Sequence, residues 1–160
     1  MRRSSVLRAT LVATLAIAAA ACSSDDGGDD DTTFNCEADL RDEPFVADLA
    51  RMGAGGVTFT IVSGDPVQLV RGTNTWTVDV AQDGAPLLGV DASLKLTPFM
   101  PDHQHGTGVR AVWTPVDGGP GRYQVGPINL WMPGIWEVTI EATPTGTPRD
   151  SVLFKFCLTA

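Results

Sequence analysis

Hydrophobic and polar residues alternate along the chain from residue 57 to the C-terminus, and a period of two is typical of β-strands buried on one face. In the clearest example, Trp136, Val138 and Ile140 alternate with glutamate and threonine. The pattern predicts seven strands, at 57–63, 75–82, 87–97, 108–116, 123–130, 135–142 and 151–158. Turn residues separate these strands at intervals that suit an all-β sandwich or barrel.

Shorter stretches between and before the strands add local detail. Asp83-Gly84, between the second and third predicted strands, predicts a hairpin turn. Residues 43–52 contain a proline near their start and are followed by Gly53, which predicts one or two helical turns. The glycine-rich run 53–56 precedes a strand and not a helix. We therefore expect a hinge into the first strand rather than a phosphate-binding loop.

The first 21 residues have a basic start followed by an apolar run, which is the pattern of a signal peptide. The apolar run is shorter than the roughly 20 residues that a membrane-spanning helix needs. The alanines before Cys22 resemble the lipobox of bacterial lipoproteins, in which that cysteine is lipidated. We expect a signal peptide at 1–21 and a lipidated, acidic and flexible tether at 22–33, which anchors the protein to a membrane. A secreted soluble form is the alternative.

Two further cysteines, Cys36 and Cys157, lie near the two ends of the remaining chain. An even pair in an exported protein predicts a structural disulfide. A redox-active or metal-binding pair is the alternative, but neither cysteine has a Cys-x-x-Cys spacing or a neighbouring histidine. The last strand turns Phe154 and Phe156 inward and Cys157 outward. A bridge would therefore hold the segment from Phe34 to about Met52 across the outside of that sheet.

Composition narrows the classes of function. With 43% hydrophobic residues among 160, the chain is one folded domain rather than a disordered protein. The net charge of −8 becomes more negative when the arginines of the signal peptide are removed, which argues against nucleic acid as a partner. No serine lies near a histidine, and the carboxylates occupy outward strand positions or the tether, so we do not expect an enzyme.

The two histidines of the chain, His103 and His105, lie in one short segment that begins at Met100. Met132 precedes a proline in a second turn. Thioether and imidazole groups together select copper, particularly Cu(I), over harder ions. Zinc is a weaker candidate, because only Asp102 could join the histidines as one of its usual ligands. The alternative is that both methionines fill the core and both histidines face solvent.

Three motifs occur in the order that is found in the YtkA-like domain of bacterial exported proteins, a family related to FixH-like proteins. They are an Asp-Gly-x-Pro hairpin at 83–86, a Met-Pro-x-His-x-His turn at 100–105 and a Met-x-Gly-x-Trp strand entry at 132–136. The chain resembles this family over about residues 57–142. The resemblance implies an immunoglobulin-like β-sandwich of about seven strands.

We accordingly expect a YtkA-like β-sandwich domain at 57–160, with the N-terminal segment 34–56 packed on it. Several members of the family are associated with periplasmic copper handling or with cytochrome oxidase assembly. The resemblance therefore implies that four residues are copper ligands, namely Met100, His103, His105 and Met132.

Together these features predict a membrane-tethered periplasmic protein that holds Cu(I), as a buffer or a chaperone, and passes it to another envelope protein. Ser23 after Cys22 resembles a signal for outer-membrane rather than inner-membrane sorting. The alternative is a metal-free interaction module or assembly factor of the cell envelope, with Trp131 and Trp136 beside Met132 as anchors.

Overall fold

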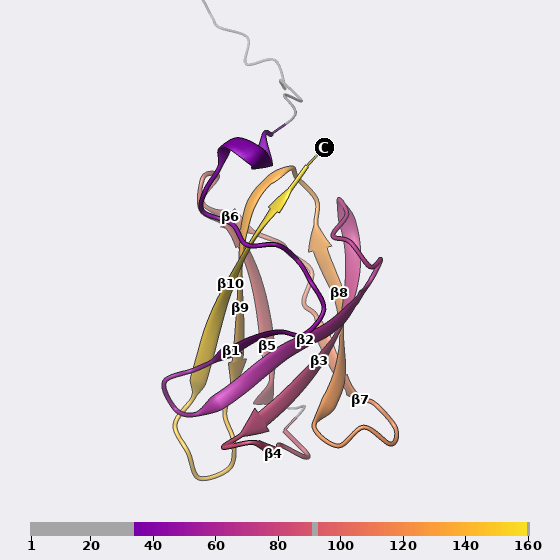
Figure 1. Ribbon diagram of the computed structural model, residues 1–160, viewed down its shortest axis with the longest axis vertical. Coiled ribbons are helices and arrows are strands. Elements are labelled where there is room, and N and C mark those ends of the chain that lie inside the picture. The colour runs from indigo at the N-terminus through magenta and orange to yellow at the C-terminus, as the bar shows by residue number, and fades with distance from the viewer. Residues whose placement is uncertain (1–33, 91–92, 160) are drawn as a thin grey trace, which may run out of the picture. The chain divides into compact units, whose positions relative to one another are not determined.

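The computed structural model describes residues 34–90 and 93–159 of the chain. The predicted signal peptide, the lipidation site Cys22 and the tether lie outside the described residues. The described residues form two antiparallel β-sheets that face each other (Figure 1). No helix among them is both long and apolar enough to span a membrane.

The first sheet has six strands, in the order β1-β2-β3-β8-β7, with β4 beside β3. These strands are β1 (Leu49–Met52), β2 (Val57–Asp65), β3 (Gly72–Gln82), β4 (Ala85–Pro86), β7 (Val112–Pro115) and β8 (Arg122–Leu130). The second sheet has the order β10-β9-β5-β6. Its strands are β5 (Lys95–Met100), β6 (His105–Gly106), β9 (Gly134–Ala142) and β10 (Asp150–Leu158).

The strand order confirms the immunoglobulin-like sandwich. Four strands, β2-β3-β8-β7, face three strands, β10-β9-β5, and their order along the chain matches the four-plus-three arrangement of immunoglobulin constant domains. The short strands β1, β4 and β6 extend the two sheets. The seven strands of this arrangement therefore correspond in order to the seven that alternation predicts, although two of them, β5 and β7, are shorter than the prediction.

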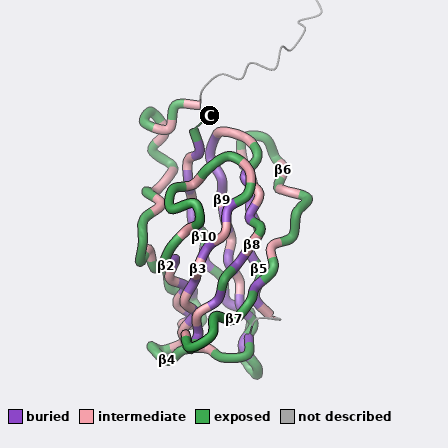
Figure 2. The backbone as a smooth tube through the Cα atoms, turned by 90° about the vertical axis from the view of Figure 1, so that its right-hand side faces the viewer, coloured by how far each residue is buried: buried purple, intermediate pink, exposed green. Residues whose placement is uncertain are grey.

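Alternating side chains fill the space between the sheets, as the sequence pattern predicts. In β3, Trp76 and Val78 are fully buried, and in β9 Trp136 and Val138 are equally inaccessible. Figure 2 shows buried positions concentrated along the strands and exposed ones in the connections. Burial of each large apolar side chain contributes about 1.5–3 kcal/mol, so this double layer supplies the main stabilisation of the fold.

The expected strand at 87–97 is confirmed only at its C-terminal end, 95–97. After β4 the chain leaves the first sheet and crosses to the second, and only residues from Lys95 onward form β5. Gly89 adopts a φ of +65°, and the backbone N–H of Ser93 donates to the Val90 carbonyl at 2.7 Å. Val90 and Leu94 are buried in the core without belonging to a strand. Their alternation therefore reflects burial and not strand pairing.

The hairpin turn at Asp83-Gly84 is confirmed, because both residues have the positive φ, 51° and 80°, that a tight two-residue turn requires. It joins β3 to the two-residue strand β4 rather than to a long partner. The predicted strand at 108–116 is also shorter than expected and is limited to β7.

The N-terminal segment corrects two further expectations. Residues 43–52 contain no helix, and their last four form β1, which pairs with β2. The ring of Phe45 lies 5.3 Å from that of Trp76 in the first sheet and 5.3 Å from that of Phe156 in the second. The segment thus closes the edge between the sheets instead of lying only across the outside of one sheet. The reason is the large apolar side chain of Phe45, which gains burial at that edge. The predicted disulfide between Cys36 and Cys157 is present.

The glycine-rich run 53–56 forms the turn between β1 and β2 and surrounds a carboxylate of the same chain. The backbone N–H of Val57 donates to one oxygen of Asp150 at 2.9 Å, and that of Ser151 donates to the other at 2.9 Å. Burial by itself raises the pKa of Asp150, but hydrogen bonds from the backbone N–H groups of Val57, Gly55 and Ser151 outweigh it and hold the pKa below its usual value. These hydrogen bonds attach the turn 53–56 to the first residue of β10, so the turn is not a hinge. We call the turn and the carboxylate it surrounds the Asp150 clasp.

Candidate functional site

Two connections lie together at one end of the sandwich, which we call the histidine end. The turn 101–104 joins β5 to β6, and the loop 131–133 carries the chain from β8 in the first sheet to β9 in the second (Figure 1). Strand β10 also ends there, because Leu158 lies opposite Gly134 in the β9–β10 register. The topology therefore brings the two motifs that contain the candidate ligands to one place.

The β5–β6 hairpin determines how the histidines are presented. Met100 and His105 lie directly opposite each other in its register, so their side chains project to the same face of the sheet. Gln104 has a φ of +56°, and its side-chain amide donates to the Pro101 carbonyl across the turn. A Cβ at Gly106 would stand 2.7 Å from the Pro98 carbonyl oxygen, so only glycine fits at that position.

The two imidazole rings lie side by side at the tip of this hairpin. The ring centroids of His103 and His105 are 5.7 Å apart, with an interplanar angle of 51°. His103 is exposed and His105 is partly buried. With metal–nitrogen bonds of about 2 Å, two imidazoles on one ion have centroids roughly 5 to 6 Å apart, so the observed spacing fits a shared ion.

The surroundings of His105 leave one of its nitrogens free. Its Nδ1 lies 3.2 Å from the Gly106 carbonyl oxygen. A carbonyl oxygen only accepts, so this hydrogen bond makes Nδ1 the protonated nitrogen and leaves the Nε2 lone pair available to a metal. One face of the His105 ring is stacked on Trp131, with ring centroids 5.2 Å apart. His105 is thus oriented by contacts on both the ring edge and the ring face.

The two methionines reach the histidine end at different depths. Met100 is fully buried, so its side chain is part of the core. Its methyl group abuts Gly134, where an added Cβ would be 2.8 Å away. Met132, two residues earlier in the chain, is partly buried against the core, and its carbonyl accepts a 2.9 Å hydrogen bond from the indole of Trp136. The start of β9, two residues after Met132, therefore lies against the side chain of Met100.

Sequence reasoning missed one charged residue at this end, Arg41. Its guanidinium donates to both oxygens of Asp102, each at 2.7 Å, and also to Asp39, two residues earlier. Hydrogen bonds from Arg41 hold the pKa of Asp102 below its ordinary value, and the two carboxylates raise the pKa of Arg41. Because 61 residues separate Arg41 from Asp102, no local pattern in the sequence signals the pair.

A comparison with known protein families identifies the family of this chain. The model of the YtkA-like family matches residues 51–141, which is more than half of the chain and includes all four candidate ligands. The chain belongs to the YtkA-like family. Membership of the YtkA-like family indicates an extracytoplasmic protein of the cell envelope.

A solved structure also resembles this YtkA-like protein. It is a DUF4426 family protein from Pseudomonas aeruginosa, 12% identical, with a TM-score of 0.49 over 68% of this chain and 94% of the other. No curated protein matches the YtkA-like chain.

The available donor atoms limit which metal the YtkA-like domain would hold. Among residues 34–90 and 93–159, no three histidine, cysteine, aspartate or glutamate side chains come together as a metal site. Asp102, the acidic residue beside the histidines, has both oxygens bonded to Arg41. The described residues at the histidine end therefore offer the two imidazoles, while Met100 is part of the core and Met132 is packed against it.

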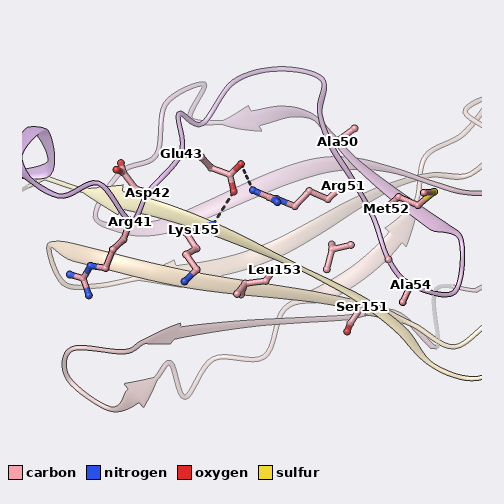
Figure 3. A pocket seen from close by; sticks show the side chains of 12 residues that line it. Arg41, Asp42, Glu43, Ala50, Arg51, Met52, Ala54, Ser151, Leu153 and Lys155 are labelled. Atoms are coloured by element: carbon pink, nitrogen blue, oxygen red, sulfur yellow. Dashed lines mark hydrogen bonds and ion pairs between the residues drawn. The ribbon is translucent and has the colours of Figure 1, made fainter.

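A groove of about 650 Å³ lies along β1 and β10, and the histidines do not line it (Figure 3). Glu43 crosses it and accepts hydrogen bonds from Arg51 at 2.7 Å and from the Lys155 backbone N–H at 3.1 Å. The amine of Lys155 pairs with Glu137 at 2.7 Å. Because these charges are paired within the fold of the YtkA-like domain, we assign the groove a structural role.

Proposed function

We propose that this protein binds copper as Cu(I) at the histidine end and serves in the cell envelope as a copper buffer or chaperone. The observation that carries the proposal is the placement of His103 and His105. Their rings lie 5.7 Å apart at an exposed tip, and the Nε2 of His105 is left without a partner from its own turn. Imidazole and thioether donors together favour Cu(I) over hard ions such as Mg²⁺ or Ca²⁺.

The methionines are proposed to complete the site from the protein side. Met100 projects to the same face as His105, and Met132 lies two residues before Gly134, which is against the methyl group of Met100. A thioether keeps its lone pairs without being protonated, so a partly buried position suits it as a ligand. His103, on the exposed side, would be the ligand that a receiving protein displaces first.

We propose that the protein is located in the periplasm. A lipid on Cys22 would anchor it in the outer membrane rather than in the inner membrane. Two or three acyl chains, at about 0.8 kcal/mol per buried CH₂, would hold the protein at the membrane. The acidic tether would let the histidine end reach a partner. Labelling with a radioactive fatty acid tests this part, because Cys22→Ser should abolish incorporation.

Competitive titration tests the copper proposal. The full chain carrying Cys22→Ser removes both the lipid and a thiolate that would itself bind Cu(I). With a chromogenic Cu(I) chelator as competitor, we expect saturable binding of one ion. His103→Ala together with His105→Ala should weaken it by about 100-fold or more, since two ligands are lost. Gln124→Ala, an exposed polar position on β8, is the matched control. Equal affinity in the double variant and the control would refute the proposal.

One observation favours a second candidate, a metal-free docking or assembly role. Trp131 is 47% exposed at the histidine end, and tryptophan is enriched among residues that dominate binding interfaces. Trp136 is fully buried and is therefore not available as an anchor. In this role Trp131→Ala would abolish capture of the partner, whereas the histidine double variant would leave capture unchanged.

A further inference from the structure

We propose that Arg41 determines the metal selectivity of the histidine end, because it occupies the carboxylate of Asp102 and keeps that group from becoming a ligand. This inference rests on the proposed copper site and adds a positioning residue to it. Asp102 directly precedes His103 in the turn and is the only acidic residue between β5 and β6. Whether its oxygens are free therefore decides which donor atoms the turn offers.

The contact between Arg41 and Asp102 uses both oxygens of the carboxylate. Nη1 of Arg41 donates to Oδ1 and Nη2 donates to Oδ2, each at 2.7 Å. Such a pair of parallel hydrogen bonds fixes the plane of the carboxylate as well as its position. Both oxygens of Asp102 are engaged on the side of the N-terminal segment.

Arg41 is in turn held from three sides. Asp39 accepts from its Nε at 2.9 Å and from its backbone N–H at 2.9 Å. Five residues before it, Cys36 is bonded to Cys157 in β10. Two residues after it, the backbone N–H of Glu43 donates to the Lys155 carbonyl at 2.8 Å. The backbone on both sides of Arg41 is thus attached to β10, and Asp39 holds the guanidinium together with Asp102.

The chemical consequence concerns hard and soft donors. One carboxylate with two imidazoles is a donor set typical of Zn(II), whereas imidazoles with thioethers suit Cu(I). With Asp102 engaged by Arg41, the β5–β6 hairpin presents its two imidazoles without a carboxylate, and any further donor in the proposed site is a methionine thioether. Release of Asp102 would add a hard oxygen donor beside His103 and raise the affinity for Zn(II).

A purely structural role for Arg41 makes a different prediction. If the pair only fastened the N-terminal segment to the turn, loss of Arg41 would lower stability and loosen the histidines. It would then reduce affinity for every ion alike. A gain of Zn(II) affinity that requires Asp102 is therefore a result that a structural role does not produce.

The experiment measures Zn(II) and Cu(I) affinities by competition with chromogenic chelators, using the full chain with Cys22→Ser. The variants are Arg41→Gln, Asp102→Asn and the two combined. We expect Arg41→Gln to bind Zn(II) at least about 10-fold more tightly and the combined variant to lose that gain. Asp102→Asn alone should leave Cu(I) affinity unchanged. Arg51→Gln, which breaks the pair with Glu43 in the neighbouring groove, is the matched control and should show no Zn(II) gain.

A second variant, Arg41→Lys, distinguishes loss of the hydrogen bonds to Asp102 from a general loss of folding. Arg41→Lys keeps the charge but cannot make the two parallel hydrogen bonds, so we expect a smaller Zn(II) gain than in Arg41→Gln. No Zn(II) gain in either variant with a native thermal transition, or a gain that persists without Asp102, would overturn the inference. The wild-type Cu(I) titration judges the proposed function separately. If wild type binds no Cu(I) but Arg41→Gln gains Zn(II) through Asp102, the proposed function fails and the masking by Arg41 stands.

Discussion

The imidazole of His105 lies flat on the indole of Trp131, with ring centroids 5.2 Å apart and planes 18° from parallel. His105 belongs to the edge strand β6 of the second sheet, whereas Trp131 follows the last residue of β8 in the first. The stacking therefore joins the two chain segments that carry the candidate copper ligands. It also covers one face of the imidazole and leaves its edge for coordination.

Loss of this stacking should weaken Cu(I) binding without abolishing it. Aromatic pairs contribute about 0.5–1.5 kcal/mol beyond their burial, so Trp131→Ala should lower the Cu(I) affinity by about 2- to 10-fold. Trp131→Phe retains a stacking face and should restore most of it. Competitive titration of both variants measures the difference. Wild-type affinity in Trp131→Ala would mean that the indole does not orient His105.

The buried carboxylate of Asp150 should make stability depend on pH. Backbone hydrogen bonds hold its pKa below 3.8, so its contribution is complete above that value and is lost as the pH falls through the lower pKa of the folded state. Asp150→Asn should cost about 1–3 kcal/mol at pH 7, because a neutral amide group replaces a carboxylate that accepts from backbone N–H groups. Urea unfolding at pH 7 and at pH 3 measures it. A difference between wild type and Asp150→Asn that is equally large at both pH values would contradict this.

Glycine at position 53 should be required for the clasp around Asp150. A Cβ there would lie 2.2 Å from an oxygen of the Asp150 carboxylate, so the turn or the carboxylate must move. Gly53→Ala should destabilise the fold by about 1–3 kcal/mol, as overpacking generally does. Gly108→Ala is the matched control, since its Cβ meets nothing within 4 Å. Thermal unfolding of the two variants compares them, and equal transitions would show that the clasp adjusts freely.

Removal of the disulfide should have a stability effect and a local effect. Cys36 and Cys157 are 121 residues apart, and for a loop of that order the loop-entropy relation gives an upper value of about 4–5 kcal/mol. Replacement of both cysteines by serine should lower the urea midpoint accordingly. It should also free the segment before Arg41 and increase hydrogen exchange at Arg41 more than at β9. If hydrogen exchange increases equally at Arg41 and at β9, the hydrogen bond from Glu43 is sufficient to hold the N-terminal segment on β10.

Local burial explains why alternation predicts the long strands and fails between them. In β9 and β10 each residue is paired with a neighbouring strand, so inward and outward positions follow the chain strictly. Residues 87–90 and 93–94 lie outside the strands, yet Val90 and Leu94 are also buried, and the pattern does not distinguish the two cases. The position of Phe45 depends on a gap between two finished sheets, which no short window of sequence contains.

Some features of the candidate site also follow from the sequence, whereas others depend on the folded structure. The motifs place His103, His105 and Met132 in turns, and the immunoglobulin topology brings those turns to one end, which the sequence predicts once the strands are assigned. The burial of Met100 follows from its place in the alternation of β5, where Leu96 and Met100 both face the core. The Arg41–Asp102 pair could not be predicted, because it depends on where the disulfide holds the N-terminal segment.

The two methionines should contribute unequally to copper binding, and leucine substitutions separate them. Leucine nearly matches methionine in volume, so Met100→Leu in the core should cost less than about 1.5 kcal/mol of stability. Each substitution removes one thioether, and the double variant should bind Cu(I) much more weakly while Cu(II), which prefers imidazole, is affected less. Titration of each variant with Cu(I) and with Cu(II) gives the ratio of the two affinities. If Met132→Leu alone lowers the Cu(I) affinity and Met100→Leu does not, Met100 is a core residue only, and the site consists of His103, His105 and Met132. An unchanged Cu(I) affinity in the double variant would remove the thioethers from the site and leave a histidine pair that favours Cu(II).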